Sequence, residues 1–326
     1  MMFPRGTQLI TKNVLIKRVI KENLQSCKRW YMPRRALMYV PGDDTRKLNK
    51  AFKIDVDCIV MDFEDGVAAN RKEIARNTIR KLLDNGKPVK PRNYDWAIRI
   101  NSIPSGLFED DLKVILTGDC LPDSVLLPKI YTVDDVHYFA DAVNRYVNGS
   151  KSVNLIMYIE TAMAMINLPE LCKSAIELSK SSKFTLTTLI FGSDDFCANI
   201  GITRTYESTE ISYARQKLVL VAKAYGLQAI DMVYIMYKDM DGLKKQSEEG
   251  ARMGYTGKQV IHPAQVPIVQ DAFMPSQTQV EWATDVIKAF EEHQKSGKGA
   301  FNYDGTMIDM PTMKQAQNII NLMKSV

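Results

Sequence analysis

Eight short apolar segments rich in β-branched residues recur between residues 35 and 263, and segments with helical spacing separate them. This alternation limits the possible folds most, because strands that alternate with helices form parallel sheets. The segments are RALMYVPG (35–42), CIVMDFEDG (58–66), WAIRINS (96–102), SVLLPKI (124–130), NLIMYIET (154–161), FTLTTLIFG (184–192), QAIDMVY (228–234) and GKQVIHP (257–263). Eight strand–helix units over about 240 residues predict an α/β fold, a (β/α)8 TIM barrel.

An open, doubly wound sheet is the alternative fold. Against it, no G-x-G-x-x-G follows the first segment and no G-x-x-x-x-G-K-[ST] occurs in the chain. We expect the barrel to span residues 34–274. After Pro275 the pattern changes to an amphipathic helix, a loop and a last helix. The sequence therefore predicts a C-terminal helical lid over residues 275–326, which folds over its own barrel or a neighbour's.

The amino terminus carries most of the positive charge of the chain. Residues 1–35 contain nine Lys or Arg and one acid, so of the total charge of +5 this segment holds +8 and the rest holds −3. A basic segment with interspersed Leu, Ile and Val favours a mitochondrial transit peptide over residues 1–33, and hence the matrix. A disordered or nucleic-acid-binding tail is the alternative. The mildly acidic remainder argues against nucleic acid as the main partner.

Cysteine and histidine are too few and too scattered for a zinc site. The chain has five Cys without a C-x-x-C motif and three His without an H-E-x-x-H motif. We expect the cysteines to be free thiols, several of them buried, in a reducing compartment. No apolar run reaches the ~18–20 residues that a membrane span needs.

Two acids, Glu160 and Asp195, follow neighbouring apolar segments and lie 35 positions apart, which is about one strand–helix unit. Because the carboxyl ends of neighbouring parallel strands meet at one end of a barrel, both acids should face one pocket. Two oxygen ligands with space left for water and substrate suit Mg²⁺. The alternative is that each acid caps the helix that follows it.

Further charged residues follow other predicted strands. Asp62, Glu64 and Asp65 lie within four positions, so they need a metal or a Lys/Arg partner unless they form a solvated Asp-Gly turn. Arg99 stands in an apolar segment and needs an anion. We favour a substrate carboxylate for Arg99, with an ion pair to Glu64 or Asp65 as the alternative.

Three other positions have a functional and a structural interpretation. Arg46 and Lys50 share one helix face, which suits phosphate groups or simply faces solvent. His262, after the eighth segment, either contacts a ligand or packs into the core. Asp309 lies in a glycine-containing loop before the last helix and most simply begins that helix.

Together these segments resemble the CitE-like branch of the HpcH/HpaI aldolase superfamily. The resemblance is carried by RALMYVPG, VMDFEDGVAANRKEIAR, IRINS, LLPKI, YIETAMA, FGSDDF, YARQKLVLVAKAYGLQAID, GYTGKQVIHPAQ and GKGAFNYDGTMIDMP. These motifs run in order from about residue 34 to the end of the chain.

The resemblance implies a role for individual residues. Glu160 and Asp195 match the Mg²⁺ ligands of the family. The positions that match its substrate contacts are Tyr39, Arg46, Lys50, Arg99, Ile261 and His262. Asp309 matches the catalytic acid/base, which the family carries on a lid that reaches a neighbouring subunit's barrel. This exchange implies a homo-oligomer, a trimer.

The implied activity is Mg²⁺-dependent cleavage of citramalyl-CoA to acetyl-CoA and pyruvate. Malate or β-methylmalate synthase, malyl-CoA thioesterase, and a non-catalytic CoA-binding subunit of a lyase complex are the alternatives. Two positions depart from the family. The chain has Gly192-Ser193-Asp194-Asp195 where the family has G-x-E-D, and Arg46 stands where the family has Lys.

Overall fold

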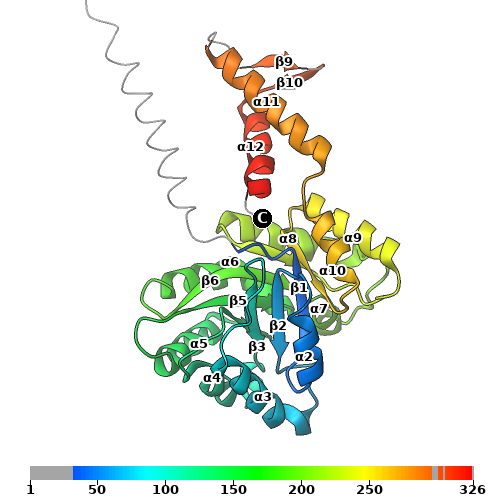
Figure 1. Cartoon of the computed structure of the whole chain (residues 1–326). Coiled ribbons are helices and arrows are strands. Elements are labelled where there is room, and N and C mark those ends of the chain that lie inside the picture. Colours follow the sequence, from blue (N-terminus) through cyan, green and yellow to red (C-terminus); the bar gives the residue numbers. More distant parts are fainter. Residues whose placement is uncertain (1–31, 296–299, 304, 325–326) are drawn as a thin grey trace, which may run out of the picture.

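Eight parallel strands close into a barrel in chain order (Figure 1), which confirms the predicted (β/α)8 TIM barrel. The computed structural model describes residues 32–295, 300–303 and 305–324. The strands are β1 (Ala36–Pro41), β2 (Cys58–Asp62), β3 (Asp95–Arg99), β4 (Ser124–Leu127), β5 (Val153–Ile159), β6 (Phe184–Phe191), β7 (Gln228–Asp231) and β8 (Gly257–Val260). Each corresponds to one of the eight apolar segments of the sequence.

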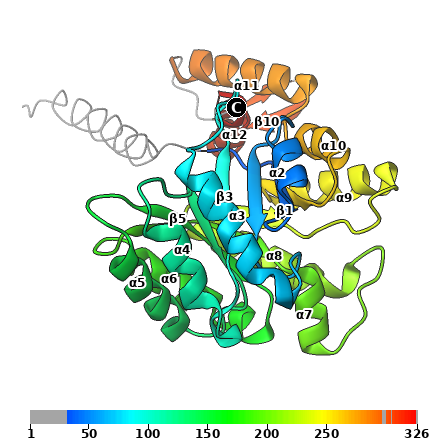
Figure 2. The same cartoon turned by 60° about the horizontal axis from the view of Figure 1, so that its bottom comes forward.

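Helices connect consecutive strands and cover the outside of the barrel (Figures 1 and 2). They are α2 (Thr45–Ala51), α3 (Lys72–Asp84), α4 (Phe108–Leu116), α5 (Val133–Tyr146), α6 (Ala162–Leu178), α7 (Ser193–Ile200), α8 (Ser212–Ala224), α9 (Met240–Met253) and α10 (Gln265–Ala272). The main core lies between strands and helices. A smaller core fills the barrel itself, with Leu37, Val60, Leu126 and Ile156 among its members. Because both faces of the strands are buried, their residues are apolar on both faces.

Buried polar side chains close the end of the barrel at which the strands begin. Arg34 is 2% exposed, pairs with Asp95, and donates to Thr188 (3.0 Å) and Ser124 (3.2 Å). A buried guanidinium is stable only when its donors are satisfied in this way. The opposite end, where the strands finish, is the mouth of the barrel.

A C-terminal hairpin of helices follows the barrel and stands apart from it (Figure 1). It consists of α11 (Gln277–Lys295), β9 (Phe301–Tyr303), β10 (Thr306–Ile308) and α12 (Met310–Lys324). Its buried residues form a separate cluster that includes Ala283, Val286, Ile308 and Ala316. The two helices agree with the sequence, but the expected loop between them contains a two-stranded antiparallel sheet. We call this unit the C-terminal hairpin.

The hairpin begins at the end of the barrel opposite the mouth. It follows α10, which returns from the carboxyl end of β8, as each helix of a (β/α)8 barrel returns from its strand. Both views show α11 and α12 projecting beyond the barrel body (Figures 1 and 2).

Three of the cysteines, Cys58, Cys172 and Cys197, are buried free thiols, as expected. Cys120 is a partly exposed free thiol, and Cys27 lies outside the described residues, as does the predicted transit peptide. Within the described ranges, the helices are all too short or too polar to cross a membrane.

Candidate active site at the barrel mouth

Glu160 and Asp195 both lie at the mouth. Glu160 directly follows β5, and Asp195 lies in the first turn of α7, which follows β6. These strands are neighbours, with Ile159 opposite Phe191 at their carboxyl ends. Burial raises the pKa of Glu160, and the charges of Glu64 and Asp195 add to the rise. Both acids therefore lie at the carboxyl ends of neighbouring strands.

Neither acid caps a helix, which was the alternative interpretation. Thr161 caps α6 by accepting from the backbone N–H of Ala164 (3.1 Å). The first turn of α7 has no side-chain capping hydrogen bond. Both carboxylates are therefore available for another purpose.

The position of Glu160 depends on two residues that the sequence did not single out as site residues. The backbone N–H of Lys129 donates to Oε1 of Glu160 at 2.6 Å. A Cβ on Gly192 would lie 2.5 Å from Oε2 of Glu160, which is closer than van der Waals contact allows. Only glycine at this position leaves space for the Glu160 side chain.

Asp194, the neighbour of Asp195, has a structural partner. Arg204 donates to Asp194 (3.1 Å), to Oγ of Ser193 (2.9 Å) and to the carbonyl oxygen of Val233 (2.7 Å). Arg204 thus ties the start of α7 to the loop after β7. Within residues 32–295, 300–303 and 305–324, no donor or cation is paired with Asp195.

Arg99 is held by the acids of the DFEDG segment. Its Nε and Nη2 donate to the two oxygens of Asp62 at 2.7 and 2.6 Å. Its Nη1 lies 2.9 Å from Glu64 and 3.4 Å from Asp65. Burial alone would raise the pKa of Asp62, but Arg99 holds that pKa below its usual value. The ion pair that the sequence left as the alternative is therefore present.

Two tyrosines inside the barrel flank the Arg99 guanidinium. The ring centres of Tyr39 and Tyr158 lie 4.9 and 5.9 Å from its central carbon. The Tyr39 hydroxyl donates to Oε1 of Gln259 at 3.0 Å. A cation over aromatic faces gains electrostatic attraction, so these contacts help to fix the guanidinium in place.

The remaining substrate-contact candidates are exposed residues of the rim. Arg46 and Lys50 are exposed on α2, whereas the adjacent Lys47 pairs with Asp44. Ile261 and His262 are exposed on the loop after β8, and the His262 ring centre lies 5.4 Å from that of Tyr237. The His262 ring is therefore packed against Tyr237 at the surface and is not part of the core.

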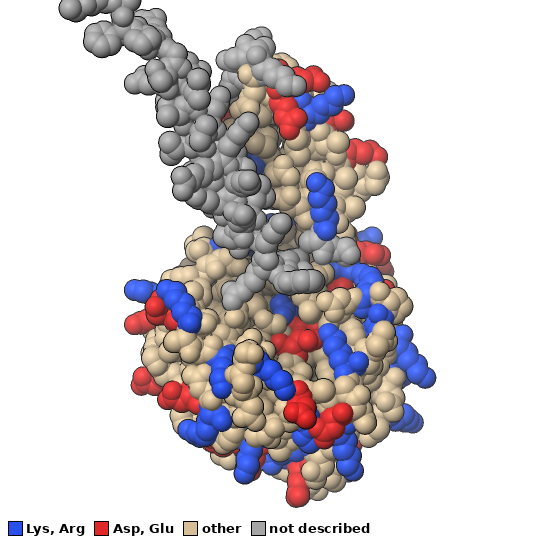
Figure 3. Space-filling view, turned by 60° about the vertical axis from the view of Figure 1, so that its left-hand side comes forward, with Lys and Arg blue, Asp and Glu red and all other residues tan. Residues whose placement is uncertain are grey.

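Basic and acidic side chains are interspersed over the barrel face drawn in Figure 3. A surface that binds nucleic acid concentrates Lys and Arg on one face. The face in this view has no such concentration among its described residues.

Asp309 lies far from the mouth of its own chain. It precedes α12 in the C-terminal hairpin and accepts from the backbone N–H of Thr312 (3.0 Å) and from Oγ1 of Thr312 (2.9 Å). The Thr312 N–H holds the pKa of Asp309 below its usual value. Asp309 therefore begins a helix, as its sequence context indicated.

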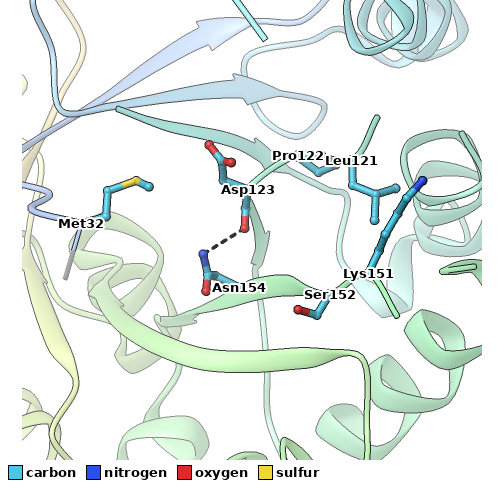
Figure 4. Close-up of a pocket in the computed structure, with 7 residues that line it drawn as sticks. All are labelled: Met32, Leu121, Pro122, Asp123, Lys151, Ser152 and Asn154. Carbon is cyan, nitrogen blue, oxygen red and sulfur yellow. Dashed lines mark hydrogen bonds between the residues drawn. The ribbon is translucent and has the colours of Figure 1, made fainter. Parts of the chain in front are cut away.

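A shallow pocket elsewhere on the barrel is not the site. It lies around the amino-terminal ends of β4 and β5, away from the mouth (Figure 4). Its lining consists of Met32, Leu121, Pro122, Asp123, Lys151, Ser152 and Asn154. Asn154 is engaged there by the carbonyl oxygen of Asp123 at 3.0 Å. The pocket contains no cluster of ionisable groups with a chemical task.

The donor set at the mouth suits a hard divalent cation. Burial raises the pKa of Glu160 to about 8, and the charges of Glu64 and Asp195 add to the shift. Burial likewise raises the pKa of Glu64 to about 7. A cation beside Glu160 would relieve this repulsion. With Glu160 and Asp195 as its ligands, such a cation would keep positions for water and substrate. The described parts of the chain contain no group of three or more His, Cys, Asp or Glu that could hold a metal ion.

The raised pKa of Glu160 predicts that the metal-free protein loses stability as the pH rises. An unfolded Glu releases its proton near pH 4.5, whereas folded Glu160 keeps it to about pH 8, so folding binds a proton between these values. Glu160 alone should lower the free energy of unfolding by about 2 kcal/mol from pH 6 to pH 8, and Glu64, with its pKa of about 7, should add a smaller fall. Urea unfolding in EDTA measures this fall, and Glu160→Gln should remove most of it. Equal falls in both proteins would contradict the assignment.

Comparison with known proteins places the chain among carbon–carbon lyases and their relatives. Residues 35–263 match the family HpcH/HpaI aldolase/citrate lyase. The human mitochondrial citramalyl-CoA lyase is 46% identical over 91% of this chain and 87% of its own length. A (3S)-malyl-CoA thioesterase of Cereibacter sphaeroides is 31% identical over 85% of this chain and 90% of its own length.

The chain is also similar to a solved structure of a CitE protein. The CitE protein of Mycobacterium tuberculosis, in complex with magnesium, acetoacetate and coenzyme A, superposes with a TM-score of 0.71. It is 26% identical, and the match covers 89% of this chain and 97% of that protein.

Proposed function

The chain belongs to the HpcH/HpaI aldolase/citrate lyase family, and from this premise we propose that it cleaves citramalyl-CoA to acetyl-CoA and pyruvate with the help of Mg²⁺. The observation that carries the proposal is the pair of carboxylates, Glu160 and Asp195, at the barrel mouth of a chain 46% identical to a citramalyl-CoA lyase. The related CitE protein binds magnesium, a small oxo acid and coenzyme A on the same fold.

Glu160 and Asp195 would hold the Mg²⁺ ion. When bound, the ion supplies positive charge that favours ionisation of the substrate hydroxyl and polarises the neighbouring carboxylate. The N–H of Lys129 keeps Oε1 of Glu160 oriented. Arg99, fixed by Asp62 and by the two tyrosine rings, would place its positive charge beside the substrate.

The rim residues would bind the coenzyme A part of the substrate. Arg46 and Lys50 are exposed cations one helical turn apart, a spacing that suits two phosphate oxygens. Ile261 and His262 offer an exposed apolar and aromatic surface after β8, and Tyr39 lies beneath Arg99. These contacts are proposals from the resemblance, and the exposure of the four rim residues supports them.

Asp309 would act as the acid/base. Cleavage of the carbon–carbon bond leaves the enolate of acetyl-CoA, and the carboxyl group of Asp309 gives a proton to its terminal carbon. In the synthetic direction the carboxylate removes that proton. Because the C-terminal hairpin starts opposite the mouth, we infer that Asp309 serves a neighbouring chain in a homo-oligomer, a trimer.

The same premise suggests how the chain is divided and where it works. We propose a barrel over residues 34–274 that carries the metal and substrate contacts, and an extension over 275–326 that carries Asp309. The related mammalian lyases are mitochondrial, which supports a transit peptide over residues 1–33 and a location in the matrix.

A thioesterase or a malate synthase is the second candidate, because a relative named (3S)-malyl-CoA thioesterase is 31% identical. The lyase and the thioesterase differ in the bond that breaks. A lyase releases pyruvate and acetyl-CoA from citramalyl-CoA, whereas a thioesterase releases citramalate and free CoA. A synthase instead joins acetyl-CoA to glyoxylate or pyruvate and then releases free CoA.

Product analysis of the purified chain separates these functions. With citramalyl-CoA and Mg²⁺ we expect equal amounts of pyruvate and acetyl-CoA, and no product in EDTA. Free CoA as the main product from citramalyl-CoA, malyl-CoA, or acetyl-CoA with glyoxylate would favour the second candidate. Complete inactivity of the chain alone would favour a binding subunit of a larger complex.

A further inference from the structure

Lys129 occupies an unusual backbone conformation at the mouth. It follows β4 and has a φ of 51°, in the left-handed region that residues with a Cβ rarely adopt. Among the described non-glycine residues only Lys129 and Ser208 have a positive φ. A conformation of this kind persists only where the surrounding contacts determine it.

The backbone and the side chain of Lys129 together reach three acids of the site. Its backbone N–H donates to Oε1 of Glu160, and its ammonium lies 2.9 Å from Oε1 of Glu64 and 3.7 Å from Asp65. The left-handed turn allows one residue to make these contacts. Burial alone would lower the pKa of Lys129, but Glu64 holds it above its usual value.

The mouth has more acids than cations. Five carboxylates stand there, and the described residues bring three cations, Arg99, Lys129 and Lys72. The five are Asp62, Glu64, Asp65, Glu160 and Asp195. Lys72 donates to the carbonyl oxygens of Phe63 and Glu64 and to Asn101, at 2.6, 2.8 and 2.8 Å. A substrate carboxylate that enters beside these acids therefore needs Arg99 or Lys129 as its cation.

Lys129 is better suited than Arg99 to bind that carboxylate. Arg99 commits Nε and Nη2 to Asp62 and Nη1 to Glu64, and Tyr39 lies against its face. The Lys129 ammonium has three donors on a flexible stem, its side chain is 30% exposed, and one of its partners, Asp65, is 58% exposed. It can therefore contact a new anion without leaving the mouth.

We propose that Lys129 binds the carboxylate of the 2-oxo acid part of the substrate while its backbone N–H holds Glu160. This proposal rests on the proposed function, since it assigns a partner to the pyruvate end of citramalyl-CoA. Lys129 is thus a substrate-binding residue through its side chain and a positioning residue through its main chain. Methionine at this position keeps the backbone N–H and the length of the stem but removes the charge.

Calorimetric titration of Lys129→Met with three ligands tests the proposal. Pyruvate with saturating Mg²⁺ should bind about tenfold more weakly or worse, the usual effect of losing a charged hydrogen bond. Mg²⁺ alone should bind within about threefold of wild type, because the N–H to Glu160 remains and a nearby positive charge has gone. Acetyl-CoA, which lacks the carboxylate, should bind as it does to wild type.

Two further variants serve as controls. Lys129→Arg keeps a cation and should restore pyruvate binding to within about threefold of wild type. Lys180 lies just after α6, at the end of the barrel away from the mouth, and its ammonium pairs with Glu177. Lys180→Met removes this ammonium. It should leave all three affinities unchanged, which excludes an effect of net charge alone.

Unchanged pyruvate binding in Lys129→Met would overturn the proposal. A fall in Mg²⁺ affinity that equals the fall in pyruvate affinity would also overturn it, because Lys129 would then only support the fold of the mouth. If the wild-type protein binds no pyruvate in the presence of saturating Mg²⁺, the proposal is likewise overturned. Failure of the proposed function is recognised separately, because it appears as absent cleavage of citramalyl-CoA by wild type while these affinities remain measurable.

Discussion

Asp309→Asn is expected to lower the rate of citramalyl-CoA cleavage by about a thousandfold. Asparagine has the shape of aspartate but cannot give or take the proton of the acetyl-CoA enolate. It is as good a helix N-cap as aspartate, so it can still accept from the Thr312 N–H and keep α12 in place. The loss should therefore come from chemistry and not from unfolding of the hairpin.

Single-turnover kinetics and ligand titration test this prediction together. Mg²⁺ and acetyl-CoA should bind the variant nearly as tightly as wild type, because neither is held by Asp309. Asp285→Asn, which neutralises an exposed carboxylate on α11 of the same hairpin, is the matched control and should be fully active. A normal cleavage rate in Asp309→Asn would remove this residue from the mechanism.

Glu160→Gln and Asp195→Asn are expected to abolish Mg²⁺ binding and, with it, activity. Each change removes one of the two anionic ligands, and the dissociation constant for Mg²⁺ should rise by about a hundredfold or more. The amide oxygen that Glu160→Gln introduces can still accept from the Lys129 N–H, so the barrel should fold. Because a repelled, buried carboxylate is lost, the metal-free Glu160→Gln variant should be at least as stable as wild type at pH 8.

Asp194→Asn provides the control for these two variants. Asp194 is adjacent to Asp195 but 52% exposed and paired with Arg204, so it should contribute little to metal binding. Calorimetric titration with MgCl₂ should therefore show binding in Asp194→Asn and none in Asp195→Asn. Equal binding in these two variants would mean that the ligand has been assigned to the wrong acid.

The barrel and the acids at its mouth could be predicted because both depend on short-range patterns. Apolar runs of strand length alternate with helical spacing, and side chains after the carboxyl ends of parallel strands must meet. The same reasoning put Glu160 and Asp195 together and left Asp309 at the start of a helix, where the structure has it.

The residues that surround these acids in space could not be predicted, because they come from distant parts of the chain. The positive φ of Lys129 and the missing Cβ of Gly192 matter only when Glu160 lies between them. Arg204 donates to Asp194 and not to Asp195, although nothing in the local sequence distinguishes the two acids. Glycine after an apolar run is a signal that could have indicated close packing there.

An ion pair of Arg99 with Glu64 or Asp65 was predicted from the sequence only as an alternative, and its pairing with Asp62 was not predicted. A buried arginine must pair with an anion, but the sequence does not say whether the anion belongs to the protein or to the substrate. The structure pairs the guanidinium with Asp62, Glu64 and Asp65. Because Arg99 and Lys72 are held by buried protein acceptors, the partly exposed Lys129 is the cation of the mouth that can most readily contact a new anion.

Mixing two inactive variants tests most directly the central claim, that the metal site and Asp309 of one active site come from different chains. Glu160→Gln chains have an intact hairpin, and Asp309→Asn chains have an intact barrel mouth. If the two are unfolded together, refolded as mixed oligomers and assayed for pyruvate release, roughly a quarter of the sites should combine both intact parts. We predict recovery of about that fraction of wild-type activity. Mixtures as inactive as the separate variants would contradict the divided site.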